Sequence, residues 1–267
     1  MSPSTSTILI NKPYQHDDSL LIQSSPQRKR DHHLDLLKWL ALLFMVIDHL
    51  RYVSPFFAWC YIPGRLAFPF FSLVIAAHVN FLFNQHAKLD QLLRYLLWLL
   101  VFALISEWPY ELFIPKARST NVFVTLFLGV FFIVGFLREK ITGVLLGATI
   151  IGGSFWLQSQ VMYGVAGVLL PCAFLLALRY GSLTWCLPTL VCFWANYRYV
   201  SVDALVQLKL YPVAALIISL LAAIIGKWVL SMPLPIKIWP VKKWAYAFYP
   251  LHLLLLYSAR IFLQSID

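Results

Sequence analysis

Long runs of apolar residues follow one another along almost the whole chain after residue 33. These runs approach or exceed the roughly 20 residues that a helix needs to cross a bilayer. They predict nine helical spans, at 34–53, 63–83, 91–113, 120–137, 142–157, 161–179, 183–198, 210–230 and 244–263. Two of the runs, 142–157 and 183–198, are short for a full crossing, so eight spans is an open alternative. The predicted fold class is all-α: a polytopic helical membrane protein with about nine (eight to ten) transmembrane helices.

The composition supports one membrane domain. Hydrophobic residues make up 61% of the chain and charged residues 12%, which is too apolar for a soluble domain. The alternating pattern of an outer-membrane barrel is absent. We therefore expect a single integral-membrane domain over residues 34–267. Residues 1–33 are rich in Ser, Pro, Gln and charge, and we expect a disordered cytoplasmic tail without a cleavable signal.

The net charge of +10 sits mainly in this tail and in short loops, so it indicates membrane topology. The excess of Lys and Arg on alternate loops places the N-terminus in the cytoplasm. No basic stretch belongs to a soluble module, which argues against nucleic-acid binding. The loop Ser231–Trp244 has three prolines and three lysines and is expected to be extended, on anionic headgroups.

The four cysteines show no CxxC spacing and no clustering with histidine, so we expect small core residues. They are Cys60, Cys172, Cys186 and Cys192. No metal site is indicated. P-loop, dinucleotide-binding, HExxH and GxSxG motifs are also missing, which leaves hydrolase and nucleotide-driven pump functions without their residues.

The first apolar run, LDLLKWLALLFMVIDHLRY, holds four ionisable residues: Asp35, Lys38, Asp48 and His49. Each costs roughly 2.5–3.5 kcal/mol in a bilayer-depth helix, so anchoring alone does not explain them. Lys38 and His49 are eleven residues apart, which places them on one helix face about 16 Å apart along the axis. A simpler alternative pairs Asp35 with Lys38 at i,i+3 at the membrane surface.

A neutral imidazole near the membrane boundary can take and return a proton near pH 7, and Asp48 could hold the ring of His49. Arg65 follows Pro63–Gly64 and is permanently charged, so it needs a carboxylate or phosphate partner. The candidate partners are Asp48, Glu107 and Glu111, and an interfacial anchor is the alternative.

Three more segments carry candidate residues. Glu107 and Glu111 flank Pro109, which favours a turn or a broken helix end. Asn121 opens the fourth predicted span. His252 lies in the last span, where it is either a second site residue or a satisfied core histidine.

These residues belong to blocks that resemble the TraX family, the membrane acetylases of F-type conjugative pilin. The family itself looks like a distant branch of integral-membrane acyltransferases of the acyltransferase-3 type, whose first helix carries a basic residue, ten residues and a histidine. Here that motif reads Lys38-x10-His49. The matching blocks follow the family's order and are DLLKWLALLFMVIDH, GRLAFPFFSLVIA, SEWPYELF, NVFVTLFLG and FYPLHLL. Ala77–His78 depart from it, because an acidic residue and a glycine are expected there.

The resemblance implies an acetyltransferase of the bacterial inner membrane, which moves the acetyl group of acetyl-CoA to the N-terminal amine of a pilin subunit. Lys38 and Asp35 would then serve the acetyl-CoA side. His49 would be the general base or the acetyl carrier, Asp48 would orient its ring, and Arg65 would bind the oxyanion or pair Asp48. Glu107, Glu111, Asn121 and His252 would lie on the substrate side, and no metal is involved.

Other functions remain open from the residues alone. The acceptor could be a glycan or lipid hydroxyl, which would make the chain an O-acyltransferase. A transporter could also use intramembrane charges, but no later span repeats the Asp48–His49 pair as an internal repeat would require. A pilus-assembly factor without catalytic activity would tolerate loss of His49.

Overall fold

The computed structural model describes residues 31–84, 89–114, 117–136, 141–197, 207 and 209–266. Most of the predicted tail, residues 1–33, lies outside them. The described residues form helices, turns and extended connections, without a strand. The helices are α1 His32–Leu50, η2 Pro55–Cys60, α2 Tyr61–Gly64, α3 Ala67–Asn84, α4 Leu89–Phe113, α5 Val122–Phe136, α6 Ile141–Trp156, α7 Gly164–Tyr180, η3 Ser182–Trp185, α8 Cys186–Tyr197, α10 Leu210–Ser231 and α11 Trp244–Gln264.

An α-helix stands at each of the nine apolar runs, so the all-α prediction is confirmed for the described residues. Four helical stretches there are long and apolar enough to cross a membrane: Pro55–Asn84, Asp90–Phe113, Leu210–Ser231 and Trp244–Gln264. The helices α5, α6 and α7 are apolar but shorter. These stretches indicate a membrane protein, while the number of crossings stays a prediction.

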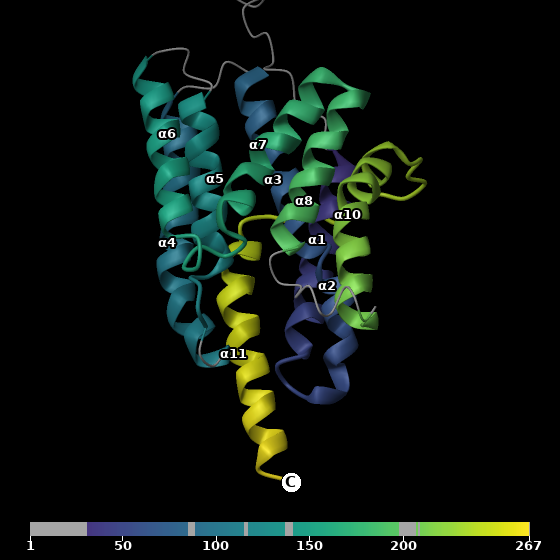
Figure 1. The fold of residues 1–267 in the computed structure, drawn as a ribbon. Coiled ribbons are helices and arrows are strands. Elements are labelled where there is room, and N and C mark those ends of the chain that lie inside the picture. The colour runs from purple at the N-terminus through teal and green to yellow at the C-terminus, as the bar shows by residue number, and fades with distance from the viewer. Residues whose placement is uncertain are drawn as a thin grey trace, which may run out of the picture. The chain divides into compact units, whose positions relative to one another are not determined.

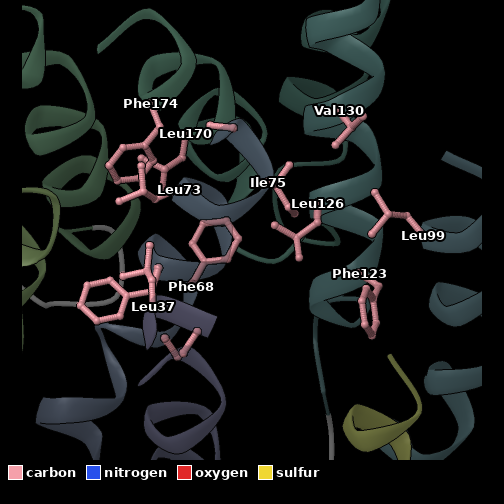
Figure 2. Packing of buried hydrophobic residues seen from close by; sticks show 14 of the residues in the cluster. Leu37, Phe68, Leu73, Ile75, Leu99, Phe123, Leu126, Val130, Leu170 and Phe174 are labelled. Carbon is pink, nitrogen blue, oxygen red and sulfur yellow. The ribbon is translucent and has the colours of Figure 1, made fainter. Parts of the chain in front are cut away.

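The outer surface of the helices agrees with a lipid environment. Large apolar side chains stand exposed on it, including Leu104, Leu145 and Leu255. Such a surface would be an aggregation hazard in water but is ordinary against acyl chains. The buried side of the helices forms a core of apolar residues that Figure 2 shows between α3, α5 and α7.

Helix α7 packs against α3, α5, α6 and α8, and α3 packs in turn against α1 and α10. On the other side of α5, helix α4 contacts both α5 and α11. Figure 1 shows these helices running side by side, with α1 among α2, α3 and α10. Helix α1, which carries the ionisable residues, is thus surrounded by protein on several sides.

Close helix contacts depend on glycine in α5 and α7. A Cβ on Gly129 would meet the Pro171 ring at 2.9 Å and the Val168 carbonyl oxygen at 3.0 Å. A Cβ on Gly167 would meet Thr125 and the Met162 carbonyl equally closely. Small residues let helix backbones approach in membrane proteins, where packing rather than hydrophobicity drives helix association.

The prediction of a turn at Pro109 is wrong, because α4 continues through it to Phe113. Proline removes one backbone donor, but here only the last turn of a 25-residue helix follows it. The end of α4 is also held from outside. Arg260 of α11 donates to the Phe113 carbonyl at 2.7 Å and to the Leu112 carbonyl at 3.3 Å.

The segment after α10 is extended, as predicted. Side chains near the start of α1 form hydrogen bonds to it. Trp39 Nε1 donates to the Trp239 carbonyl at 3.0 Å, and the Val241 N–H donates to Asp35 at 3.4 Å. A ring nitrogen of His33 lies 2.8 Å from the Met232 carbonyl oxygen. Whether this segment lies on headgroups stays a prediction.

The cysteines are free thiols. Cys60, Cys172 and Cys192 are buried, as expected of core residues. Cys186 is exposed, so the prediction of a core role is wrong there. It is the first residue of α8, where the chain has just turned from η3 and the packed face of the helix has not yet begun.

We expect Gly129→Ala to lower the thermal unfolding temperature of the detergent-solubilised protein. The added methyl group meets a proline ring and a backbone oxygen, neither of which can rotate away, and overpacking of this kind costs about 1–3 kcal/mol. Gly152→Ala is the matched control, because a Cβ there meets nothing within 4 Å. Equal unfolding temperatures for the two variants would show that the α5–α7 contact is not tight.

Candidate functional site

A cavity of about 380 Å³ lies where α1 ends. Its walls come from α1, α2, α4, α11, the start of α3 and the residues before α5 and α7. The charged residues on the wall are Asp48, Arg51 and Arg65, and the ring of His49 lies beside them. Tyrosines complete the polar wall: Tyr52, Tyr61, Tyr110, Tyr163 and Tyr249. Polar groups in an otherwise apolar cavity are typical of a ligand site.

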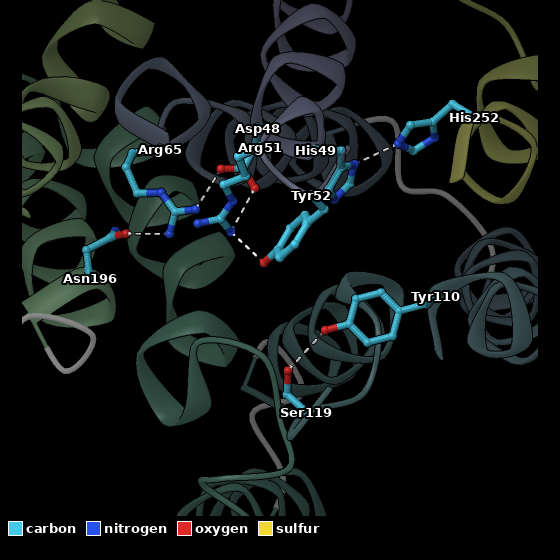
Figure 3. Close-up of polar contacts among 9 residues, drawn as sticks. All are labelled: Asp48, His49, Arg51, Tyr52, Arg65, Tyr110, Ser119, Asn196 and His252. Atoms are coloured by element: carbon cyan, nitrogen blue, oxygen red, sulfur yellow. Dashed lines mark hydrogen bonds and ion pairs between the residues drawn. The ribbon is translucent and has the colours of Figure 1, made fainter. Parts of the chain in front are cut away.

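The charged wall is built around one carboxylate, as Figure 3 shows. Arg65 Nη2 donates to Asp48 Oδ1 at 2.9 Å, and Arg51 Nη2 lies 3.4 Å from Asp48 Oδ2. Arg65 is buried and also contacts the Asn196 side-chain oxygen of α8 at 3.4 Å. The predicted partnership of Arg65 with Asp48 is therefore present.

Gly64 makes this ion pair possible. A Cβ at position 64 would overlap the carboxylate group and Cβ of Asp48. The Pro63–Gly64 break ends α2 and lets the chain pass directly over α1. Arg65, the next residue, then reaches the carboxylate from the side.

Aromatic rings lie against both guanidinium groups. Tyr61 lies beside both, with its ring centroid 4.8 Å from Arg51 Cζ and 4.3 Å from Arg65 Cζ. Such cation–π contacts stabilise desolvated guanidinium groups. Arg51 also donates to the Tyr52 hydroxyl at 2.8 Å in the turn after α1.

The His49 ring is held by a second histidine. Nδ1 of His49 lies 2.8 Å from Nε2 of His252, and both residues are buried (Figure 3). Nδ1 of His252 lies 3.0 Å from the Phe248 carbonyl oxygen. We expected Asp48 to orient the His49 ring, but the residue in hydrogen-bond contact with the ring is His252. Asp48 and His49 are consecutive residues of α1, and their side chains leave the helix about 100° apart. Asp48 therefore faces the arginines, and His49 faces α11.

The hydrogen bonds set the tautomers of this pair when both rings are neutral. A carbonyl oxygen only accepts, so His252 carries its proton on Nδ1. Its Nε2 then accepts, and the proton between the rings belongs to His49 Nδ1. The remaining nitrogen, His49 Nε2, has a free lone pair. A histidine in this state can act as a base.

The other substrate-side candidates split into two groups. The Asn121 N–H donates to Glu107 at 3.1 Å, and the Asn121 side chain donates to the Ala103 carbonyl and accepts from the Phe123 N–H. These bonds join α4 to the start of α5, behind the cavity wall. Glu111 is exposed. Neither glutamate nor Asn121 is part of the cavity wall, whereas the neighbours Tyr110 and Val122 are.

Lys38 and Asp35 lie toward the other end of α1, away from the cavity wall. Lys38 Nζ is 3.1 Å from Asp35 Oδ1, which is the i,i+3 pair of the simpler alternative. The Asp35 carboxylate is buried and serves Lys38 and the Val241 N–H, while Lys38 is partly exposed. Binding of acetyl-CoA by these two residues stays a prediction.

The family model described as TraX protein matches residues 33–260, which covers most of the chain and every residue of the site. The chain belongs to the TraX family. No curated protein and no solved structure matches it. Membership is consistent with a pilin-related function in conjugation, and the proposed likeness to acyltransferase-3 proteins is not confirmed.

Sequence reasoning missed Arg51 and the tyrosines of this TraX-family site. Arg51 has a local signal, because it stands three residues after Asp48. For Tyr163 the local signal in the sequence is weaker: it is followed by a glycine, Gly164. Both residues adopt positive φ, 61° and 56°, at the start of α7. For a bulky residue this is a strained conformation, and here it places the Tyr163 ring on Phe68, with centroids 4.3 Å apart.

In the TraX-family fold, Asp48→Asn should destabilise the protein strongly. It keeps the shape of the side chain but leaves Arg65 buried without its counter-charge, which typically costs 3–5 kcal/mol. Thermal unfolding in detergent, followed by circular dichroism, measures the loss.

The matched control for Asp48→Asn is Glu111→Gln, which removes an exposed carboxylate. It should change stability by no more than about 0.5 kcal/mol. Similar unfolding temperatures for both variants would mean that the Asp48–Arg65 pair contributes nothing to the fold.

Proposed function

We propose that this protein is a membrane acetyltransferase that moves the acetyl group of acetyl-CoA to the N-terminal amine of a conjugative pilin subunit. One observation carries the proposal. His49 shares its Nδ1 proton with His252, which leaves Nε2 as the basic nitrogen of a histidine on the wall of an arginine-lined cavity. TraX membership supports the pilin as acceptor.

In the proposed reaction, acetyl-CoA supplies the thioester carbonyl. His49 Nε2 takes a proton from the acceptor amine while the nitrogen of that amine attacks the thioester carbonyl. His252 Nε2 accepts the Nδ1 hydrogen and keeps the base in the correct tautomer. Collapse of the intermediate releases the thiolate of CoA, and the proton on His49 can pass to it.

A second route has the acetyl group rest on His49 Nε2 before it reaches the amine. The geometry serves both routes, because each needs an unprotonated Nε2. The cavity volume lies at the lower end of the range for small-molecule sites, which suits the two reacting ends of larger substrates.

We further propose that about nine helices cross the bacterial inner membrane, with the N-terminus in the cytoplasm. The basic loops of the sequence support this orientation. Lys38 would then lie on the side where acetyl-CoA is found and the cavity toward the opposite side, where a processed pilin presents its amine. An acceptor hydroxyl on a glycan or lipid is the second candidate, since the same base would activate it.

The intact mass of the cognate pilin tests the proposed reaction. We expect one acetyl group on the pilin N-terminus in cells that make the wild-type protein. It should be absent from cells without the protein and from cells with His49→Ala at matched membrane levels. General-base catalysis contributes about 10²–10⁴-fold, so the loss should be nearly complete.

Glu111→Gln is the control for expression and insertion in that experiment, and it should acetylate like the wild type. An unmodified pilin in every strain, with the protein inserted, refutes the pilin as acceptor. A pilin that is acetylated equally in the His49→Ala strain refutes His49 as the reactive group.

His252 should act as a positioning residue. His252→Ala removes the acceptor for the His49 Nδ1 hydrogen, so kcat should fall about 10–100-fold, the usual cost of losing such an orienting partner. KM should change little, because His252 is not on the cavity wall.

His252→Gln provides the rescue, because its amide oxygen can accept the same hydrogen bond. We expect it to recover at least part of the lost kcat in an acetyl-transfer assay with purified protein. If both His252→Ala and His252→Gln raise KM and lower the unfolding temperature, the residue has a structural role only.

A further inference from the structure

The charges on the cavity wall do not balance. Two guanidinium groups, of Arg51 and Arg65, face a single carboxylate, that of Asp48. The Nε atom of each arginine is buried without a hydrogen-bond partner in the described part of the chain. Buried donors are normally satisfied, and a buried excess charge in a membrane domain calls for a counter-ion.

Nothing else on this wall supplies the missing negative charge. Asn196 and Tyr52 offer neutral oxygens to the guanidinium groups, and Tyr61 offers the face of its ring. Among the described residues that line the cavity, Asp48 is the sole carboxylate. The described wall therefore carries an excess of positive charge that an anionic ligand could neutralise.

A second hollow leads toward the same arginine. An open groove of about 560 Å³ lies between the turn after α1 and the end of α11, and it shares Arg51 and Tyr52 with the cavity. Arg260 also lines it, and its described lining residues include no carboxylate. Arg260, Arg51 and Arg65 thus form a series of positive charges from the groove into the cavity, which would guide an anionic group inward.

We propose that Arg51 and Arg65 bind a carboxylate of the acceptor, supplied by an acidic side chain close behind its N-terminal amine. This inference rests on the proposed function for its peptide acceptor. Guanidinium groups match carboxylates in shape and bind them by paired N–H donors. With the carboxylate held there, the amine of the same short segment lies within the cavity beside His49.

The phosphates of acetyl-CoA are a poorer match for this pair of arginines. In the proposed orientation acetyl-CoA arrives near Lys38, which lies eleven residues and about 16 Å along α1 from His49. The arginines lie at the opposite end of the helix, with the base. A carboxylate bound by the two arginines therefore belongs to the acceptor and not to acetyl-CoA.

Binding of two hexapeptides to the full-length purified protein in nanodiscs tests this proposal without acetyl-CoA. Both peptides have a free N-terminal amine and an amidated C-terminus, and they differ only in Glu or Gln at the fourth position. Charge-assisted hydrogen bonds are strong enough for a roughly tenfold difference in Kd in favour of the Glu peptide. Arg51→Gln should abolish that difference and leave Kd for the Gln peptide within about twofold.

Arg51 is the better position to change, because its side chain is 22% exposed whereas that of Arg65 is 5% exposed. Arg118→Gln is the matched control: it removes an exposed arginine away from the cavity wall and should preserve the tenfold preference. Thermal unfolding of each variant excludes misfolding as the cause of a change.

Equal Kd values for the two peptides with the wild-type protein overturn the proposal, whatever the outcome of the acetylation assay. Binding of phosphatidylethanolamine to the wild-type protein also overturns the proposal if Arg51→Gln abolishes it and neither peptide competes with it. That result would assign the arginines to a lipid phosphate. A clear Glu preference together with an unmodified pilin keeps the carboxylate subsite and refutes only the acetyl transfer.

Discussion

The Asp48 carboxylate is the interaction on which the site depends. A single acidic group, partly buried at the end of α1, receives hydrogen bonds from Arg65 and Arg51. Through them it joins α1 to the α2–α3 corner and, by way of Asn196, to α8. Charges are costly at membrane depth unless they are paired, so this group of residues can exist only if the helices around it stay together. Gly64 permits the contact because it has no side chain.

The adjacent residue, His49, uses the opposite direction. Because successive side chains on a helix point about 100° apart, a helix that gives Asp48 to the arginines presents His49 to α11. His252 meets it there at 2.8 Å. The aspartate–histidine pair therefore does not form a dyad. It connects α1 to helices on two sides, and the histidine receives its orientation from a histidine 203 positions away in the sequence.

The residues around the cavity form a fixed frame for this pair. Glu107 and Asn121 tie α4 to α5, and Arg260 ties the end of α4 to α11. Tyr163 holds a positive φ at the start of α7, where its ring lines the cavity. A frame of this kind keeps a histidine and a cation cluster at set positions, as the proposed acyl transfer would require. The TraX family assignment covers all of these residues.

The sequence alone determined the helices, because their length and apolar character are local properties that lipid exposure does not override. It also singled out Asp48, His49 and Arg65 of the cavity wall, since ionisable groups inside apolar runs need a reason. Local spacing contained the Asp35–Lys38 pair as well. Tertiary structure decided the partners. Pro109 stayed within α4, whose end Arg260 holds from outside. Only packing brought His252 to His49 and Arg65 to Asp48, because contacts between distant helices leave no spacing to read in the chain.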